Sequence, residues 1–138
     1  MNALQPWSQK LLSVLRVVAG LLFLEHGSQK LLQFPVNPAT PAHAPPLASL
    51  PGVAGVLELV GGTLIILGLF TRPVAFLLSG EMAVAYWTVH AKRGAFPVLN
   101  GGDPAIMFCF VFLYLAAAGA GDWSLDRVLG RSKQFAAA

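Results

Sequence analysis

Ionisable residues gather where a long apolar run would otherwise continue. The stretch LEHGSQKLLQF, residues 24–34, places Glu25, His26 and Lys30 close together directly after that run. A further carboxylate, Glu58, lies inside a second apolar run. In a medium of low dielectric, carboxyl and imidazole groups can exchange protons near neutral pH. These residue types predict proton exchange, with Glu58 and His26 as the candidate catalytic residues.

Four other residues are candidates for binding a polar or aromatic ligand. Lys30 and His90 each lie at the end of an apolar run, where they can hold a polar head group. Tyr86 and Trp87 lie one turn before His90 and can stack on a quinone ring. The alternative is that charges near the ends of membrane spans, and aromatic residues beside them, only anchor the helices at the interface. Both interpretations stay open.

Two further charges, Arg16 and Glu81, lie deeper within apolar runs. A helix rises about 1.5 Å per residue, and counting from the expected span starts places both about 12 Å from the same membrane boundary. A charge at such a depth costs a few kcal/mol unless it is paired. The sequence therefore predicts a structural ion pair between Arg16 and Glu81.

Several kinds of site are disfavoured by the residues present. Cys109 is the only cysteine, so no CxxC pair or intrachain disulfide can form. The histidines and carboxylates show no HxxxH or ExxH spacing, and no flavin or haem motif is present, so we expect no metal site. The formal net charge is +3, with the basic residues scattered along the chain, which disfavours nucleic-acid binding.

The composition is that of a membrane protein. Of 138 residues, 56% are hydrophobic and 11% are charged, whereas soluble domains carry about a quarter charged residues. Four apolar blocks are close in length to the roughly 17–25 residues with which a helix crosses a bilayer. None of these blocks has a consistently polar face, which disfavours a soluble helical protein. We expect one domain, 1–138, that is all-α: an integral membrane four-helix bundle with antiparallel up-down topology. The expected spans are 11–32, 53–70, 74–90 and 105–120.

The connections between the blocks differ in length and charge. Residues 35–52 contain six prolines and are expected to form a loop outside the membrane, whereas 71–73 is a short connection between antiparallel neighbours. Four spans place both termini on one side. That side has more Lys and Arg, including the basic tail 127–138, and is therefore expected to be cytoplasmic.

Helical periodicity assigns faces within the first block. Residues Arg16, Gly20, Phe23, Gly27 and Lys30 follow at intervals of four and three, and we expect this stripe to face the bundle interior. Glu25 lies nearly opposite Arg16 and is expected to face outward. Small residues in the second block, Gly55, Gly61 and Gly62, would allow close helix contact.

Together these segments resemble the DoxX family of small four-helix membrane proteins. The resemblance runs through RVVAGLLFLEHGSQKL, GVLELVGGTLIILGLFTRPVA, EMAVAYWTVH, NGGDPAIMF and GAGDWSLD, and covers nearly all of residues 12–127. It differs at Asp103, where such proteins commonly have Glu. The resemblance implies a bacterial-type inner (plasma) membrane location and a redox association, either quinone-linked sulfur oxidation or thiol stress. It also carries over the polar residues Arg16, His26, Lys30, Glu58, Arg72, Glu81, His90 and Asn100.

The functional expectation is a subunit or accessory of a quinone-linked or thiol-stress redox complex. Quinone is the expected cofactor, and a protein partner would supply the electron carrier because the chain shows no motif for one. Whether the chain is itself an enzyme stays open. One alternative is a non-enzymatic scaffold that recruits redox partners through residues 127–138. Another is a small proton-coupled transporter, which would need homo-oligomerisation.

Overall fold

The computed structural model describes residues 4–36, 38–39 and 43–130, and this part of the chain is helical without strands. The predicted all-α class is confirmed. In chain order the elements are η1 (Gln5–Trp7), α1 (Ser8–Leu32), α2 (Leu50–Leu67), α3 (Thr71–Ala85), η2 (Tyr86–His90), η3 (Ala91–Arg93), α4 (Pro97–Asn100), α5 (Asp103–Ala118) and α6 (Leu125–Val128).

The ends of α2 follow from local backbone chemistry. Ser49 caps its start, where the Ser49 hydroxyl accepts a hydrogen bond from the Gly52 N–H at 3.2 Å. Gly68 ends it in the left-handed conformation, at φ 64°. A side chain at Gly68 would also collide with Ser124 and with the Arg16 guanidinium. Glycine is therefore required there both for the turn and for the close approach.

The connection between α2 and α3 is shifted from its predicted place. The turn comprises residues 68–70, and α3 begins at Thr71, so the expected connection 71–73 is the first turn of the helix. Two backbone N–H groups at this start, from Phe70 and Thr71, donate to the Asp126 carboxylate, each at 2.8 Å. A carboxylate from a distant segment thus caps the helix.

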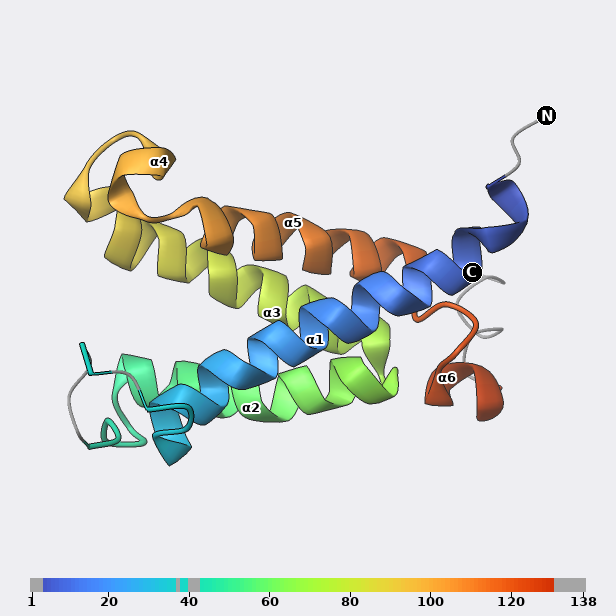
Figure 1. The fold of residues 1–138 in the computed structure, drawn as a ribbon, viewed down its shortest axis with the longest axis horizontal. Helices are drawn as coiled ribbons and strands as arrows, with labels where there is room; N and C mark the ends of the chain where they lie inside the picture. Colours follow the sequence, from blue (N-terminus) through green and yellow to red (C-terminus); the bar gives the residue numbers. More distant parts are fainter. Residues whose placement is uncertain (1–3, 37, 40–42, 131–138) are drawn as a thin grey trace.

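The long helices pack as two pairs, α1 beside α2 and α3 beside α5 (Figure 1). The pairs diverge toward the end that carries α4, and η1 and α6 both lie at the opposite end. Glycines on both sides bring α1 against α2: a Cβ at Gly27 would lie 2.5 Å from the Leu59 nitrogen, and one at Gly62 would lie 2.8 Å from the Leu24 nitrogen. The expected close helix contact is confirmed for this pair.

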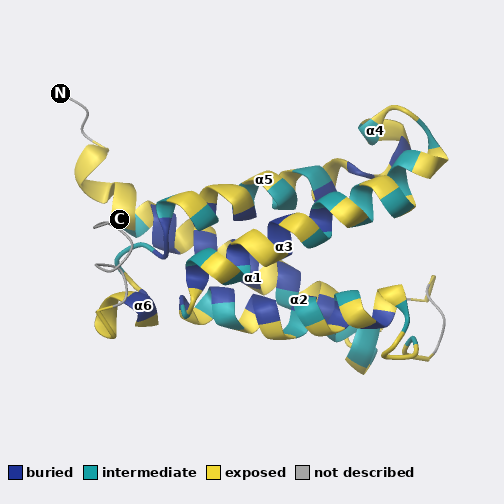
Figure 2. Ribbon diagram, turned by 180° about the vertical axis from the view of Figure 1, so that it is seen from behind, coloured by how far each residue is buried: buried dark blue, intermediate teal, exposed yellow. Residues whose placement is uncertain are grey.

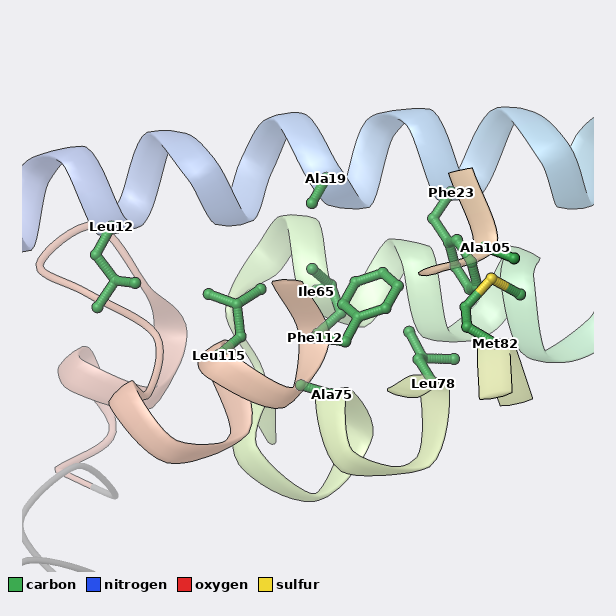
Figure 3. Close-up of a cluster of buried hydrophobic side chains, with 10 residues drawn as sticks. All are labelled: Leu12, Ala19, Phe23, Ile65, Ala75, Leu78, Met82, Ala105, Phe112 and Leu115. Carbon is green, nitrogen blue, oxygen red and sulfur yellow. The ribbon is translucent and has the colours of Figure 1, made fainter. Parts of the chain in front are cut away.

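A buried apolar cluster joins the two pairs (Figure 3). Phe23 of α1 packs edge-on against Phe112 of α5, with ring centroids 4.8 Å apart, and lies 5.5 Å from Phe108. The predicted interior stripe of α1 is confirmed, because Arg16, Gly20, Phe23 and Gly27 are buried and Lys30 is half-buried. The cluster comprises Leu12, Ala19, Phe23, Ile65, Ala75, Leu78, Met82, Ala105, Phe112 and Leu115.

The outer faces of the helices are apolar and exposed (Figure 2). Two helical segments, Gln5–Leu32 and Leu50–Leu67, are long and apolar enough to cross a membrane, and α5 is apolar but shorter. Only 39% and 33% of the apolar windows of the two long segments are buried, whereas a core helix of a soluble protein is mostly buried. The exposed faces are therefore suited to lipid.

Gly27→Ala and Gly80→Ala form a matched pair, because each adds one methyl group to a helical glycine. At Gly27 the methyl would overlap the backbone of α2, whereas a Cβ at Gly80 would have no described atom within 4 Å beyond its chain neighbours and its own helix backbone. We expect Gly27→Ala to lose about 1–3 kcal/mol of stability through overpacking. Gly80→Ala should be neutral or gain up to about 1 kcal/mol from helix propensity. Thermal unfolding in detergent, followed by circular dichroism, measures both; equal midpoints would contradict the close α1–α2 packing.

Candidate functional site

A cavity of about 1240 Å³ lies mainly between α2 and α3. Its walls come from residues 50–58 of α2 and 73–85 of α3, with contributions from α1, η2 and the start of α5. Most of the lining side chains are apolar, and the few polar ones come from α1, α2, α3 and η2. The polar lining side chains are His26, Lys30, Glu58, Glu81, Thr88 and His90.

An ion pair between α1 and α2 forms part of this polar wall. The Lys30 ammonium donates to Glu58, with Nζ 2.6 Å from Oε1. Glu58 is buried, whereas the Lys30 side chain is 37% exposed, so the ammonium reaches the carboxylate from the cavity side. Periodicity and depth had placed these residues at one level, and the structure brings them into direct contact.

Glu81 of α3 contributes a second buried carboxyl group to the cavity. Within the described residues, neither of its oxygens has a hydrogen-bond partner, and Glu58 Oε2 also has none. Glu58 and Lys30 both lie within electrostatic range of Glu81. One ammonium therefore lies near two carboxyl groups in a largely apolar cavity, and His26 is a second basic group near Glu58.

The predicted ion pair between Arg16 and Glu81 is wrong. The fully buried Arg16 guanidinium donates to backbone carbonyls: Nε to Ala120 O at 2.8 Å, Nη1 to the carbonyls of Ile65 and Ile66, and Nη2 to that of Trp123. Two of these carbonyls belong to the last turn of α2, where the helix dipole favours a cation; the Ile65 carbonyl also accepts from the Gly68 N–H at 3.0 Å. Arg16 thus joins α1, α2 and the segment after α5.

The error came from the depth estimate for Glu81. Because α3 begins at Thr71 instead of residue 74, Glu81 lies about 4–5 Å farther along the helix than was assumed. The start of α2 at Leu50 instead of residue 53 likewise moves Glu58 about 4–5 Å toward Glu81, and together these shifts bring the two carboxyl groups to similar levels. The side chain of a helical residue also leans toward the helix N-terminus, which carries the Arg16 guanidinium away from the cavity. A depth counted from helix starts that were inferred from sequence could not distinguish the level of Glu81 from that of Arg16.

Asp126 is a structural residue that sequence reasoning missed. Its carboxylate caps α3, and its own N–H donates to Gly68 O at 2.8 Å. Asp126 is also the acidic group that acts electrostatically on Arg16. The only signal was its place at the end of the GAGDWSLD motif. The capping role depends on tertiary contact between the segment after α5 and the α2–α3 turn, which no local sequence pattern indicates.

The two histidines lie at different parts of the cavity wall. His26 is exposed, packs perpendicular to the Phe108 ring at a centroid distance of 6.3 Å, and lies within electrostatic range of Glu58. His90 lies at the end of η2, where its Nδ1 is 3.2 Å from Asn100 O. Ideal α-helical periodicity would put His90 opposite Glu81. The π-helical turn of η2 rotates less per residue, which helps both residues to line one cavity.

The remaining predicted residues have other surroundings. Tyr86 stacks on His90, with ring centroids 6.5 Å apart, and packs against Gly102 instead of lining the cavity. Trp87 is 70% exposed and also lies outside the cavity lining. Glu25 is exposed, as its position on α1 predicts. Of the basic tail, residues 131–138 lie outside the described residues.

The sequence matches the DoxX family profile over residues 11–91, more than half of its length. The chain belongs to the DoxX family. One relative is an uncharacterized protein of Haemophilus influenzae that is 43% identical over 129 residues. The alignment covers 91% of this chain and 96% of the relative. Family membership and the exposed apolar helix faces together identify a membrane protein.

Two more distant relatives carry descriptive names. An uncharacterized membrane protein of Mycobacterium tuberculosis is 28% identical over 130 residues, covering 85% of this chain and 80% of the relative. A Bacillus subtilis protein named "Putative oxidoreductase CatD" is 27% identical over 127 residues, covering 88% of each chain. No solved structure matches this DoxX protein.

Replacing Arg16 and Glu81 separately and together tests the corrected contacts. Arg16→Leu removes the guanidinium donor from the carbonyls of Ala120, Ile66 and Trp123, and at about 1–3 kcal/mol each we expect a loss of about 3 kcal/mol. Glu81→Leu removes a carboxyl group that has no hydrogen-bond partner in the described chain, so stability should stay unchanged or rise. The effects should add in the double variant. Folded yield in detergent measures these effects. If the double variant had a higher folded yield than Arg16→Leu alone, that result would support the original prediction of an Arg16–Glu81 ion pair.

Proposed function

We propose that this DoxX protein binds a quinone in the α2–α3 cavity and serves as a membrane subunit or accessory of a redox complex. The observation that carries the proposal is the combination, in one cavity, of a mostly apolar lining and a charged cluster formed by Lys30, Glu58 and Glu81, in which three carboxyl oxygens have no partner within the described residues. A membrane quinone has the matching division into an apolar chain and a polar ring. The oxidoreductase name of the Bacillus subtilis relative agrees with this assignment.

The cavity dimensions fit an amphiphile better than a small polar metabolite. Pockets for small molecules are commonly about 300–1,000 Å³, and this cavity, at about 1240 Å³, exceeds that range. Its apolar walls would accept part of an isoprenoid chain. A small polar substrate would leave most of that wall unfilled.

The charged cluster supplies groups suited to a quinone head. The half-exposed Lys30 ammonium can donate to a ring carbonyl while it remains paired with Glu58. Glu58 Oε2 has no partner among the described residues and His26 lies nearby, so these two residues can hold and release protons beside the ring. A quinone exchanges electrons and protons together, and a partner protein would exchange the electrons.

The proposal includes an arrangement in the membrane. The helices α1, α2, α3 with η2, and α5 would cross a bacterial-type inner membrane in alternating directions, as an antiparallel four-helix bundle. Lys10, Arg72 and Arg127 would then lie at the cytoplasmic end, and Lys92 and Arg93 at the other. The charged cluster would lie in the outer half of the bilayer.

Binding of a quinone analogue is the direct test. A decyl-substituted benzoquinone added to the purified protein in detergent should raise the thermal midpoint in a saturable manner. At a free concentration one hundred times Kd, stabilisation should approach about 2.7 kcal/mol. Lys30→Met should weaken binding, because it removes the cationic donor.

Two controls separate binding from partitioning into micelles. Decanol, which has the chain without the ring, should produce no saturable shift. Arg93→Met removes a cation that does not line the cavity and should bind as wild type does. Absence of a saturable shift with the wild-type protein, under conditions where a known quinone protein responds, would refute quinone binding.

The orientation can be tested independently of any ligand. A fluorescent reporter that folds only in the cytoplasm should be active when fused after residue 138, and a reporter that requires export should be inactive there. The reverse pattern should appear when each reporter is inserted in the Pro-rich loop, residues 35–52. An exported C-terminus would overturn the orientation and place the charged cluster near the cytoplasmic face.

A further inference from the structure

The glycines within the long helices differ in what surrounds them. A Cβ at Gly20, Gly27, Gly61 or Gly62 would meet atoms of a neighbouring helix at 2.9 Å or less. A Cβ at Gly80 of α3 would meet no described atom of another segment within 4 Å, although Gly80 lines the cavity. Glycine inside a helix costs about 0.5–1 kcal/mol relative to alanine, and no packing contact in the described chain requires it here. Its distinctive effect is to leave open space beside the cavity.

That space lies on the side of the cavity that faces outward from the bundle. Lining residues on both walls are strongly exposed and apolar, including Val53 of α2 and Phe76 and Leu77 of α3. They share the apolar, exposed character of the helix faces suited to lipid. An occupant can therefore pass between α2 and α3 from the hydrocarbon layer without its chain entering water.

The next residue in the chain is Glu81, which gives this route a polar end. Both Glu81 oxygens are buried and unpartnered within the described residues, and the Lys30–Glu58 pair lies close enough to act on them electrostatically. A buried polar group without a partner is unfavourable. A carbonyl or hydroxyl on an occupant would satisfy it, accepting from the carboxyl group when it holds a proton or donating to the carboxylate when it does not.

We propose that the occupant enters sideways from the lipid between α2 and α3, that its chain lies across Gly80, and that Glu81 contacts its head group. This rests on the proposed quinone binding and adds the route, the orientation and a contact residue that sequence analysis had assigned to an ion pair. Gly80 and Glu81 are successive residues, so one short segment of α3 would contact both the apolar chain and the polar head group of the occupant.

The test compares a quinone that has a chain with one that lacks it. In Gly80→Phe the added Cβ meets no neighbouring atom of the described residues and the ring extends into the open space beside it, so we expect a thermal midpoint that matches or exceeds that of wild type. It should bind the decyl-substituted benzoquinone at least about tenfold more weakly, equivalent to about 1.4 kcal/mol, and bind the same ring without the decyl chain as wild type does. Gly80→Ala should bind both within about twofold of wild type, because one methyl group leaves most of the space.

Variants at Glu81 test the head-group contact. Glu81→Leu should weaken binding of both quinones by about tenfold, because it removes all hydrogen-bonding capacity at that point. Glu81→Gln, which keeps the shape and hydrogen bonding, should restore most of the affinity. Thermal midpoints of the ligand-free variants show whether each is folded.

The outcomes separate this inference from the proposed function. If wild type binds neither quinone, quinone binding itself fails. If wild type binds and Gly80→Phe binds the decyl compound equally well, lateral passage across Gly80 is wrong while quinone binding stands. If Glu81→Leu binds both compounds as wild type does, the head group lies elsewhere on the cavity wall.

Discussion

The hydrogen bonds of the Arg16 guanidinium hold one end of this protein together. They join α1 to the last turn of α2 and to the segment that follows α5. In an apolar medium, both the guanidinium and these carbonyls would be strongly unfavourable alone. Each satisfies the other, and Asp126 extends the network by capping α3. The end near the termini is therefore closed by polar contacts.

The opposite end is arranged differently, and the cavity follows from that difference. The glycine contacts keep α1 against α2, and α3 lies beside α5, but the two pairs diverge toward α4 (Figure 1). The space between α2 and α3 is consequently not filled by protein side chains. Lys30 and Glu58 form an ion pair on one wall, and Glu81 lies on the other, where its oxygens have no partner within the part of the chain that the structure describes. Polar groups close one end of the molecule, and at the other they line an opening.

The sequence predicted features that depend on local periodicity and missed those that depend on distant backbone. The interior stripe from Arg16 to Lys30, the glycine contacts and the common level of Lys30 and Glu58 follow from spacing alone. The partners of Arg16 do not, because they are carbonyls and carry no residue signature. The early start of α3 depends on the Asp126 cap, which only tertiary folding places there. The π-helical turn before His90 likewise has no recognisable motif in YWTVH.

The long sequence separation of the Arg16 contacts has a consequence for biosynthesis. Ala120 and Trp123 follow Arg16 by more than a hundred residues, so at roughly 5–20 residues per second they emerge from the ribosome about 5–20 s later. Of its final acceptors, the carbonyls of Ile65 and Ile66 are made first, and those of Ala120 and Trp123 are still missing during the rest of that interval. The nascent chain must satisfy the remaining donors of this guanidinium with water, headgroups or the insertion machinery until residues 120–123 have been synthesised. Final seating of the first helix therefore waits for the segment that follows α5.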